Sequence, residues 1–216
     1  MSEFTGRRLP VYLLLDCSGS MSGAPIEAVR QGLKALLMDL KSDPQAIETA
    51  FLSVITFDSS AQQLVPLTEL MSFKEPKLEA SGTTALGQGL ALLEQCIDRE
   101  VSKSTATTKG DWKPLVFIMT DGQPTDSWEA AAASLKSKKI GNIIACAAGD
   151  GADSSLLKQI TEQVVELNTL TPDALKAFFK WVSSSISLTS SSVNGPTAEG
   201  NPVNLPPPPA QIQIVP

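Results

Sequence analysis

The sequence predicts an α/β fold: a doubly wound, mostly parallel sheet with helices on both faces and one antiparallel edge strand. Continuous apolar runs, typical of strands buried on both faces, alternate along the chain with stretches whose apolar residues recur at helical spacing. Strands separated by single helices imply parallel pairing, because the helix carries the chain back to the same end of the sheet. The 216 residues, 42% of them hydrophobic, are enough for one such domain and a tail.

Six apolar runs are the expected strands. They cover residues 9–15, 50–57, 62–67, 115–120, 140–148 and 164–167. The third run contains Pro66, which an edge strand tolerates, so we expect this run to be the antiparallel edge. The expected helices cover residues 25–41, 86–97, 126–135, 153–160 and 172–186. Asp126 and Glu129 form a candidate capping box for the third of these helices.

The composition changes sharply near the C-terminus. We expect one domain over residues 1–188 and a Ser/Pro-rich tail over residues 189–216. A tail of this composition does not build a core, so we expect it to be dispensable for ligand binding by the domain. The four prolines at 206–209 form a polyproline II run, and we expect this run, Ile212 and Ile214 to lie against a surface, of this chain or of a neighbour.

Charge, hydropathy and cysteine content argue against several classes of function. Lys and Arg number 17 against 23 Asp and Glu, a net charge of −6 that repels nucleic acid and anionic lipid. No apolar run reaches the roughly 18 residues of a membrane helix, and no apolar leader segment is visible at the N-terminus. The three cysteines lack close pairs and are expected to be small core residues in a reducing compartment. We therefore expect a cytoplasmic protein that binds neither nucleic acid nor membrane.

Oxygen-bearing side chains follow two of the expected strands. Asp16, Ser18 and Ser20 come directly after the first strand, and Gly19 allows the backbone to bend between the serines. Asp121 comes directly after the strand over 115–120. In a doubly wound sheet, ligand sites lie beyond the carboxyl ends of strands. If these two strands are neighbours, Asp16 and Asp121 lie side by side, and two such close carboxylates would repel without a cation between them.

A third segment brings hydroxyl groups to the same edge. The loop Ser81-Gly82-Thr83-Thr84 stands directly before the second expected helix. A set of ligands made only of oxygen suits a hard cation rather than zinc. The three segments together predict one bound divalent cation, Mg²⁺ first, with Mn²⁺ or Ca²⁺ as alternatives.

These three segments, in this order, resemble the metal-ion-dependent adhesion site (MIDAS) of von Willebrand factor A domains. The resemblance spans roughly residues 8–188 and implies the Rossmann-like fold of that family. The metal ligands that it implies are Asp16, Ser18, Ser20, Thr84 and Asp121. The family usually has Gly-Gly-Thr with Leu six residues after the Thr. Here Thr84 lies six residues before Leu90, so the ligand role passes to Thr84 and not to Thr83.

A narrower resemblance suggests a function. The segments RRLPVYLLLDCSGSMSGAPIEAV, GTTALGQGL and WKPLVFIMTDGQPTD are similar to bacterial TerY-type members, which are associated with tellurium-resistance and general stress gene clusters. This resemblance implies a protein-interaction module, not an enzyme, in which a partner's Asp or Glu completes the coordination of the cation. The implied partners are a kinase or a phosphatase of the PP2C type.

Two other classes of function stay open. One is a metal-dependent phosphohydrolase that uses the cation as a Lewis acid. Against it, the sequence has no histidine, Ser18 has no base to activate it as a nucleophile, and Asp16 lacks the second Asp that dehalogenase-type phosphatases place at position 18. The other class is a structural subunit in which the ion only ties loops together.

Overall fold

The computed structural model describes residues 7–149, 151–193 and 205–215. Among these residues, seven strands form one sheet in the order β3-β2-β1-β4-β5-β6-β7. The strands are β1 (Leu9–Asp16), β2 (Ala50–Phe57), β3 (Ala61–Glu69), β4 (Leu115–Thr120), β5 (Asn142–Ala148), β6 (Gln163–Leu167) and β7 (Ile212–Ile214). The five central strands, which are β2, β1, β4, β5 and β6, pair in parallel. The strands β3 and β7 pair antiparallel at the two edges. The expected parallel sheet and the antiparallel edge at β3 are confirmed, and the tail adds the second antiparallel edge.

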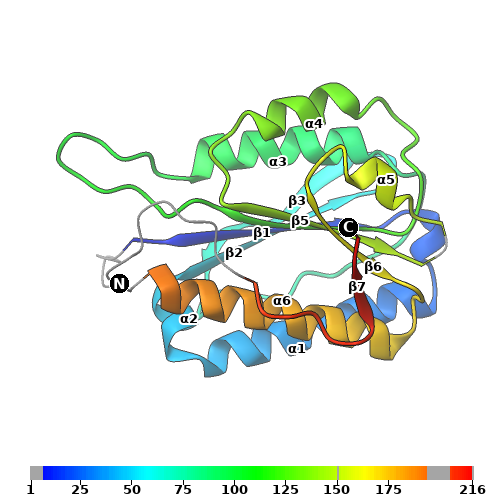
Figure 1. The fold of residues 1–216 in the computed structure, drawn as a ribbon, viewed down its shortest axis with the longest axis horizontal. Coiled ribbons are helices and arrows are strands. Elements are labelled where there is room, and N and C mark those ends of the chain that lie inside the picture. The colour runs from blue at the N-terminus through cyan, green and yellow to red at the C-terminus, as the bar shows by residue number, and fades with distance from the viewer. Residues whose placement is uncertain (1–6, 150, 194–204, 216) are drawn as a thin grey trace.

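Helices cover both faces of this sheet (Figure 1). On one face lie α1 (Ala24–Ser42), α2 (Pro44–Thr49) and α6 (Pro172–Val193), and on the other lie α3 (Leu86–Glu100), α4 (Glu129–Lys136) and α5 (Ser154–Leu157). A short 3₁₀ turn, η1 (Gly19–Met21), separates β1 from α1. The helix α2 was not expected, because a six-residue segment is too short to reveal helical periodicity.

The core consists of two apolar clusters, one on each face of the sheet. Alternate residues of β1 belong to different clusters: Leu13 and Leu15 pack on the side of α1 and α6, and Tyr12 and Leu14 pack on the side of α3. The helices α1 and α6 pack closely, since a side chain at Gly32 would run into the ring of Phe179. All three cysteines are buried free thiols, as expected.

The predicted capping box of α4 is wrong, because Asp126 caps a different helix. The N-cap position of α4 is Trp128, and no side chain caps it. The two carboxylate oxygens of Asp126 instead accept hydrogen bonds from the backbone N–H groups of Gly87 and Gln88, each at 2.9 Å. These are orphan donors in the first turn of α3. Asp126 therefore joins the loop after β4 to the start of α3.

The tail contributes to the fold more than its composition suggests. The helix α6 runs on to Val193, and the strand β7 adds to the outer edge of β6. The prediction that the tail lies against a surface is confirmed for Ile212, which is 4% exposed, whereas Ile214 is 62% exposed. The expectation that the tail gives nothing to the core is wrong for Ile212, which belongs to the apolar cluster on the face of the sheet covered by α1 and α6. The domain boundary at residue 188 stays a prediction.

Within the described part of the chain, no helix combines the length and the apolar character that crossing a membrane requires.

Candidate metal centre

The candidate site lies at the carboxyl ends of β1 and β4. Asp16 is the last residue of β1, and Asp121 follows β4 directly. The two strands are parallel neighbours with Leu15 aligned to Met119, as the sequence argument required. Chain connections leave these two strands toward opposite halves of the sheet, which is the position where doubly wound folds bind ligands. The topology therefore brings the two carboxylates to one place.

A chain of hydrogen bonds joins four of the five predicted ligands. The backbone N–H of Ser18 donates to Oδ1 of Asp16 at 2.8 Å. The hydroxyl oxygens of Ser18 and Ser20 lie 3.0 Å apart. The hydroxyl of Ser20 donates to Oδ1 of Asp121 at 2.8 Å. Two carboxylates and two hydroxyls that are up to 105 positions apart in the sequence thus form one connected group of oxygens.

The fifth predicted ligand, Thr84, is buried beside this group. A Cβ added to Gly122 would lie 3.5 Å from the hydroxyl oxygen of Thr84, so that hydroxyl faces the residue next to Asp121. Thr125 fixes the backbone of Thr84 from both sides: its hydroxyl accepts from the Thr84 N–H at 3.1 Å, and its N–H donates to the Thr84 carbonyl at 2.9 Å. The loop after β4 therefore positions Thr84.

The neighbouring Thr83 points elsewhere. It is exposed, and its backbone N–H and its hydroxyl both contact the hydroxyl oxygen of Ser59, at 3.1 and 3.3 Å. The intervening backbone depends on Gly82, which has φ +69° and whose Cβ would collide with Ser59. This geometry favours Thr84 over Thr83 as the ligand of the site.

Backbone hydrogen bonds hold two of the site loops together. The N–H of Gly19 donates to the carbonyl of Gly82 at 3.1 Å, and the N–H of Ser81 donates to the carbonyl of Cys17 at 2.8 Å. These bonds are independent of any side chain in the site. The loop with the two serines and the loop with Thr84 therefore keep their relative position if a ligand side chain is replaced.

Burial dominates the electrostatics of the two carboxyl groups. Asp16 is completely buried and Asp121 is 6% exposed. Burial raises the pKa of Asp16 above its ordinary value, although hydrogen bonds from Ser18 and Thr120 oppose the shift. Burial also raises the pKa of Asp121, and the nearby charge of Asp16 raises it further. The ionised pair is costly in this environment unless a cation compensates it.

Two residues that support the site were not predicted from the sequence. Thr120 donates from its hydroxyl to Oδ2 of Asp16 at 2.5 Å, and Thr125 clamps the backbone of Thr84. Thr120 belongs to the recognised Thr-Asp-Gly motif, so its position directly before Asp121 was a usable signal. Nothing in the local sequence marks Thr125, because its partner lies 41 positions away.

The residues present fit a divalent cation. In the described ranges, no three His, Cys, Asp or Glu side chains converge, so a cation here would take its other ligands from hydroxyls and water. The donors of the site are the carboxylates of Asp16 and Asp121 and the hydroxyls of Ser18, Ser20 and Thr84. Two negative charges balance a divalent ion, and an all-oxygen set suits a hard one.

Comparison with known proteins places the chain in a family. The family model of the von Willebrand factor type A domain matches residues 11–180. The uncharacterized protein sll0103 of Synechocystis sp. is 33% identical over 124 residues, which cover 54% of this chain but only 26% of the length of that relative.

Solved structures agree on the fold. A von Willebrand factor type A structure from Catenulispora acidiphila has a TM-score of 0.66 at 22% identity and covers 85% of this chain and 44% of that one. Proximal thread matrix protein 1 from the mussel byssus, in a structure with a zinc-occupied MIDAS motif, has a TM-score of 0.60 at 19% identity and covers 82% of this chain and 48% of that one.

Proposed function

This chain belongs to the von Willebrand factor type A domain family, and we propose that it acts as a metal-dependent protein-interaction module. The observation that carries the proposal is the connected group of oxygens from Asp16 through Ser18 and Ser20 to Asp121, at the carboxyl ends of two neighbouring parallel strands. We propose that this group, with Thr84, is a metal-ion-dependent adhesion site.

The proposed ion is Mg²⁺, with Mn²⁺ or Ca²⁺ as alternatives. Ser18, Ser20 and Thr84 would offer neutral hydroxyl ligands, and Asp16 and Asp121 would offer charge, directly or through water. Mg²⁺ prefers six oxygen ligands and keeps several waters, so a rim site with these donors retains exchangeable water. The zinc in the mussel protein is a precedent for a divalent ion in this fold, and the all-oxygen donor set of this chain favours a harder ion.

The partner, we propose, presents an Asp or Glu to this ion. Because the ion retains exchangeable water, a partner carboxylate that replaces a water gains a metal bond. A cationic side chain gains no such bond and would be repelled by the ion. The surrounding rim would supply specificity through exposed polar residues, which are Ser22, Ser81, Thr83, Gln123 and Thr125. Met21 is completely buried and is not available for such a contact.

The finer proposal concerns the biological setting. The similarity of three segments to TerY-type members supports a cytoplasmic role in a bacterial tellurite or stress response, with a kinase or a PP2C-type phosphatase as partner. An affinity pull-down from the native host in Mg²⁺ and in EDTA, followed by mass spectrometry, tests this. A kinase or phosphatase that is captured only in Mg²⁺ is the expected result, and a metal-dependent partner of another class would contradict this finer proposal.

Binding of the ion can be tested without a partner. Isothermal titration calorimetry with Mg²⁺ and Mn²⁺ should show one site, and Asp16→Ala or Asp121→Ala should abolish binding because each removes a charged ligand. Ser18→Ala and Ser20→Ala remove neutral ligands and should weaken binding less. A suitable control is Asp43→Ala, which changes the N-cap of α2 far from the site along the chain. Unchanged affinity in Asp16→Ala would exclude the proposed ligand set.

Surface plasmon resonance separates an adhesion site from a structural ion. A complex with the captured partner should dissociate in EDTA and re-form in Mg²⁺, while circular dichroism of the chain stays unchanged. Replacement of the partner's central acidic residue by Asn or Gln should have the same effect as EDTA. A dissociation constant that does not change on chelation would leave the ion with a structural role and would overturn the interaction proposal.

A further inference from the structure

The outer edge of β6 carries the returning segment 205–215. In the register of the two strands, Ile212 pairs with Leu167 and Ile214 pairs with Val165, antiparallel. The N–H of Val215 extends the pairing by donating to the carbonyl of Val164 at 2.9 Å. Without this segment, β6 would be the edge of the sheet, with a row of unpaired backbone groups. The segment therefore supplies hydrogen-bond partners for the backbone groups at the outer edge of β6.

The side chains of the segment contact both faces of the sheet. Ile212 is 4% exposed and packs into the cluster on the α6 side, where the partly buried Leu205 also packs. Val215 is partly buried against the cluster on the opposite side. Ile214, on the same strand as Ile212, is 62% exposed. The packing of the segment on the domain thus depends on a few specific positions and not on general hydrophobicity.

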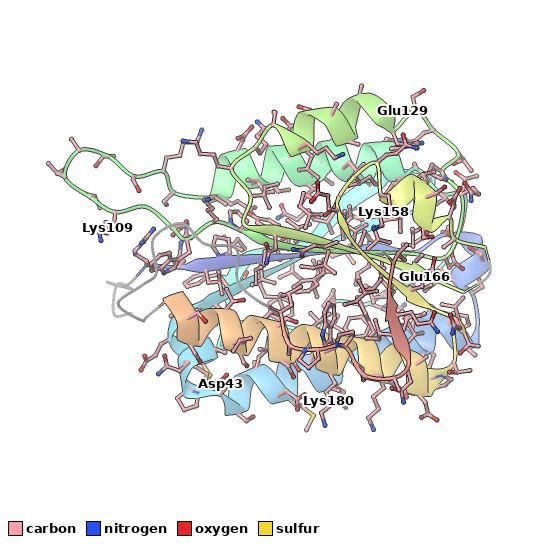
Figure 2. All side chains as sticks on the ribbon, viewed as in Figure 1. Asp43, Lys109, Glu129, Lys158, Glu166 and Lys180 are labelled. Carbon is pink, nitrogen blue, oxygen red and sulfur yellow. The ribbon has the colours of Figure 1, made fainter. Side chains whose placement is uncertain are left out.

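Two polar side chains hold the ends of the segment. The indole N–H of Trp181, on α6, donates to the carbonyl of Pro206 at 2.9 Å. The ammonium group of Lys158, after α5, donates to the carbonyl of Val215 at 2.7 Å. Figure 2 labels Lys158 beside α5 and Glu166 on β6. A polyproline II helix has no hydrogen bonds between its own residues, so its carbonyls can accept from other groups, and aromatic-lined grooves bind proline-rich segments. Here the carbonyl of Pro209, at the end of the run, accepts from the N–H of Ile212 at 2.9 Å.

We propose that the β6 edge, bounded by Trp181 and Lys158, is a binding site for a proline-led β-strand, and that its resident ligand is the chain's own segment 205–215, which leaves and returns as a unit. The ligand class follows from the contacts: a proline run whose carbonyl meets the indole, then a strand with an apolar residue at the position of Ile212. Strand addition of this kind obtains its affinity from main-chain hydrogen bonds and its specificity from alternate side chains. The strand β7 has three residues and lies at the edge of the sheet, so its release breaks the pairing with β6 and leaves the pairing among the other six strands intact.

The test uses the full chain with one of two matched substitutions on β7. Ile212→Asp places a charge at the buried position and should release the segment, whereas Ile214→Asp changes the exposed position and should leave the segment in place. A fluorescent peptide with the sequence of residues 205–215 is then titrated by anisotropy. It should bind the Ile212→Asp chain about tenfold or more tightly than the Ile214→Asp or unmodified chain, because a tethered segment competes at roughly millimolar effective concentration.

Two further variants define the site. The peptide that itself carries Ile212→Asp should not bind, and the double variant Ile212→Asp/Trp181→Phe should bind the native peptide more weakly because the indole donor is lost. If the peptide fails to bind a folded Ile212→Asp chain, the segment is a fixed part of the fold and the proposal is overturned.

A second measurement decides the matter if Ile212→Asp does not fold. In hydrogen exchange of the unmodified chain, the amides of β7 and of the β6 edge should exchange together and much faster than those of β4. Protection of β7 equal to that of β4 would overturn the proposal.

Discussion

The hydroxyl of Thr120 donates a 2.5 Å hydrogen bond to Oδ2 of Asp16, across the junction between β4 and β1. The other oxygen of that carboxylate accepts from the N–H of Ser18. Both oxygens of the completely buried Asp16 are therefore oriented by hydrogen bonds, one from the backbone of Ser18 and one from Thr120, which lies outside the predicted ligand set. In metal sites, such outer partners fix the orientation and basicity of a ligand.

Replacement of Thr120 by Val should weaken the site without disrupting the fold. The change preserves the shape of the side chain and removes its hydroxyl, which makes the short hydrogen bond to Asp16 and two longer contacts of 3.4 Å with the backbone of Gly122. We expect the Mg²⁺ affinity, measured by calorimetry, to fall by about 10–100-fold, the range for loss of an outer-shell partner. Circular dichroism should be unchanged. An affinity equal to that of the unmodified chain would mean that Asp16 does not need Thr120.

Thr84→Ala should weaken ion-dependent partner binding more than Thr83→Ala. Thr84 is buried next to Gly122, whereas Thr83 is exposed against Ser59, so only the first change removes an oxygen from the site. Surface plasmon resonance in Mg²⁺ gives the comparison, and the two variants are matched in chemistry and neighbours in sequence. Equal losses would point to a general disturbance of the loop.

Asp121→Asn should stabilise the chain in EDTA and remove the stabilisation by Mg²⁺. The pKa of Asp121 is raised in the fold, so the favourable contribution of its protonated form is lost as the pH rises through that raised pKa. At pH 7 the ionised carboxyl therefore weakens the metal-free fold, and Asn removes this cost while it can still accept from Ser20. Thermal unfolding with and without Mg²⁺ measures both effects. A melting temperature in EDTA below that of the unmodified chain would contradict this expectation.

The affinity for Mg²⁺ should fall as the pH is lowered. The pKa values of Asp16 and Asp121 are both raised, so protons compete with the ion for these carboxylates.

Asp126→Ala should destabilise the fold through α3 and not through α4. Its carboxylate satisfies the N–H groups of Gly87 and Gln88, and loss of a helix cap costs about 1–2 kcal/mol. Denaturant unfolding gives the free energy. Hydrogen exchange should show faster exchange in the first turn of α3, with α4 unaffected. Faster exchange confined to α4 would restore the capping box that the sequence suggested.

The purified chain should not hydrolyse phosphate esters, peptides or nucleotides. The sequence contains no histidine, and Glu is absent from the loops that carry the metal motifs. Proton transfer in hydrolysis needs a positioned base. Assays in Mg²⁺ and Mn²⁺, with Ser18→Ala as control, test this expectation. A metal-dependent rate that disappears in Ser18→Ala would place the chain among the enzymes.

The sequence by itself determined six of the seven described strands, the parallel pairing of the central ones and the segments that form the candidate site. Buried strands such as β1 and β4 are short, continuous and mainly apolar runs, so they can be recognised without any tertiary information. Because chain direction in a parallel sheet sends all carboxyl ends to one edge, the strand assignment alone placed Asp16 and Asp121 at the same edge. That β1 and β4 are neighbours, which brings the two residues together, came from the structure.

Only the tertiary structure determined the hydrogen-bond partners of the polar side chains. Asp126 and Glu129 have the spacing of a local cap, yet Asp126 binds α3, because the folded loop brings those orphan N–H groups within reach. Thr125 and Thr120 support the site through partners that lie 41 and 104 positions away. The strand β7 shows the same limit. Its segment is too short and too proline-rich to indicate a place in the core. It gains one because the unpaired edge of β6 supplies hydrogen bonds that no local pattern encodes.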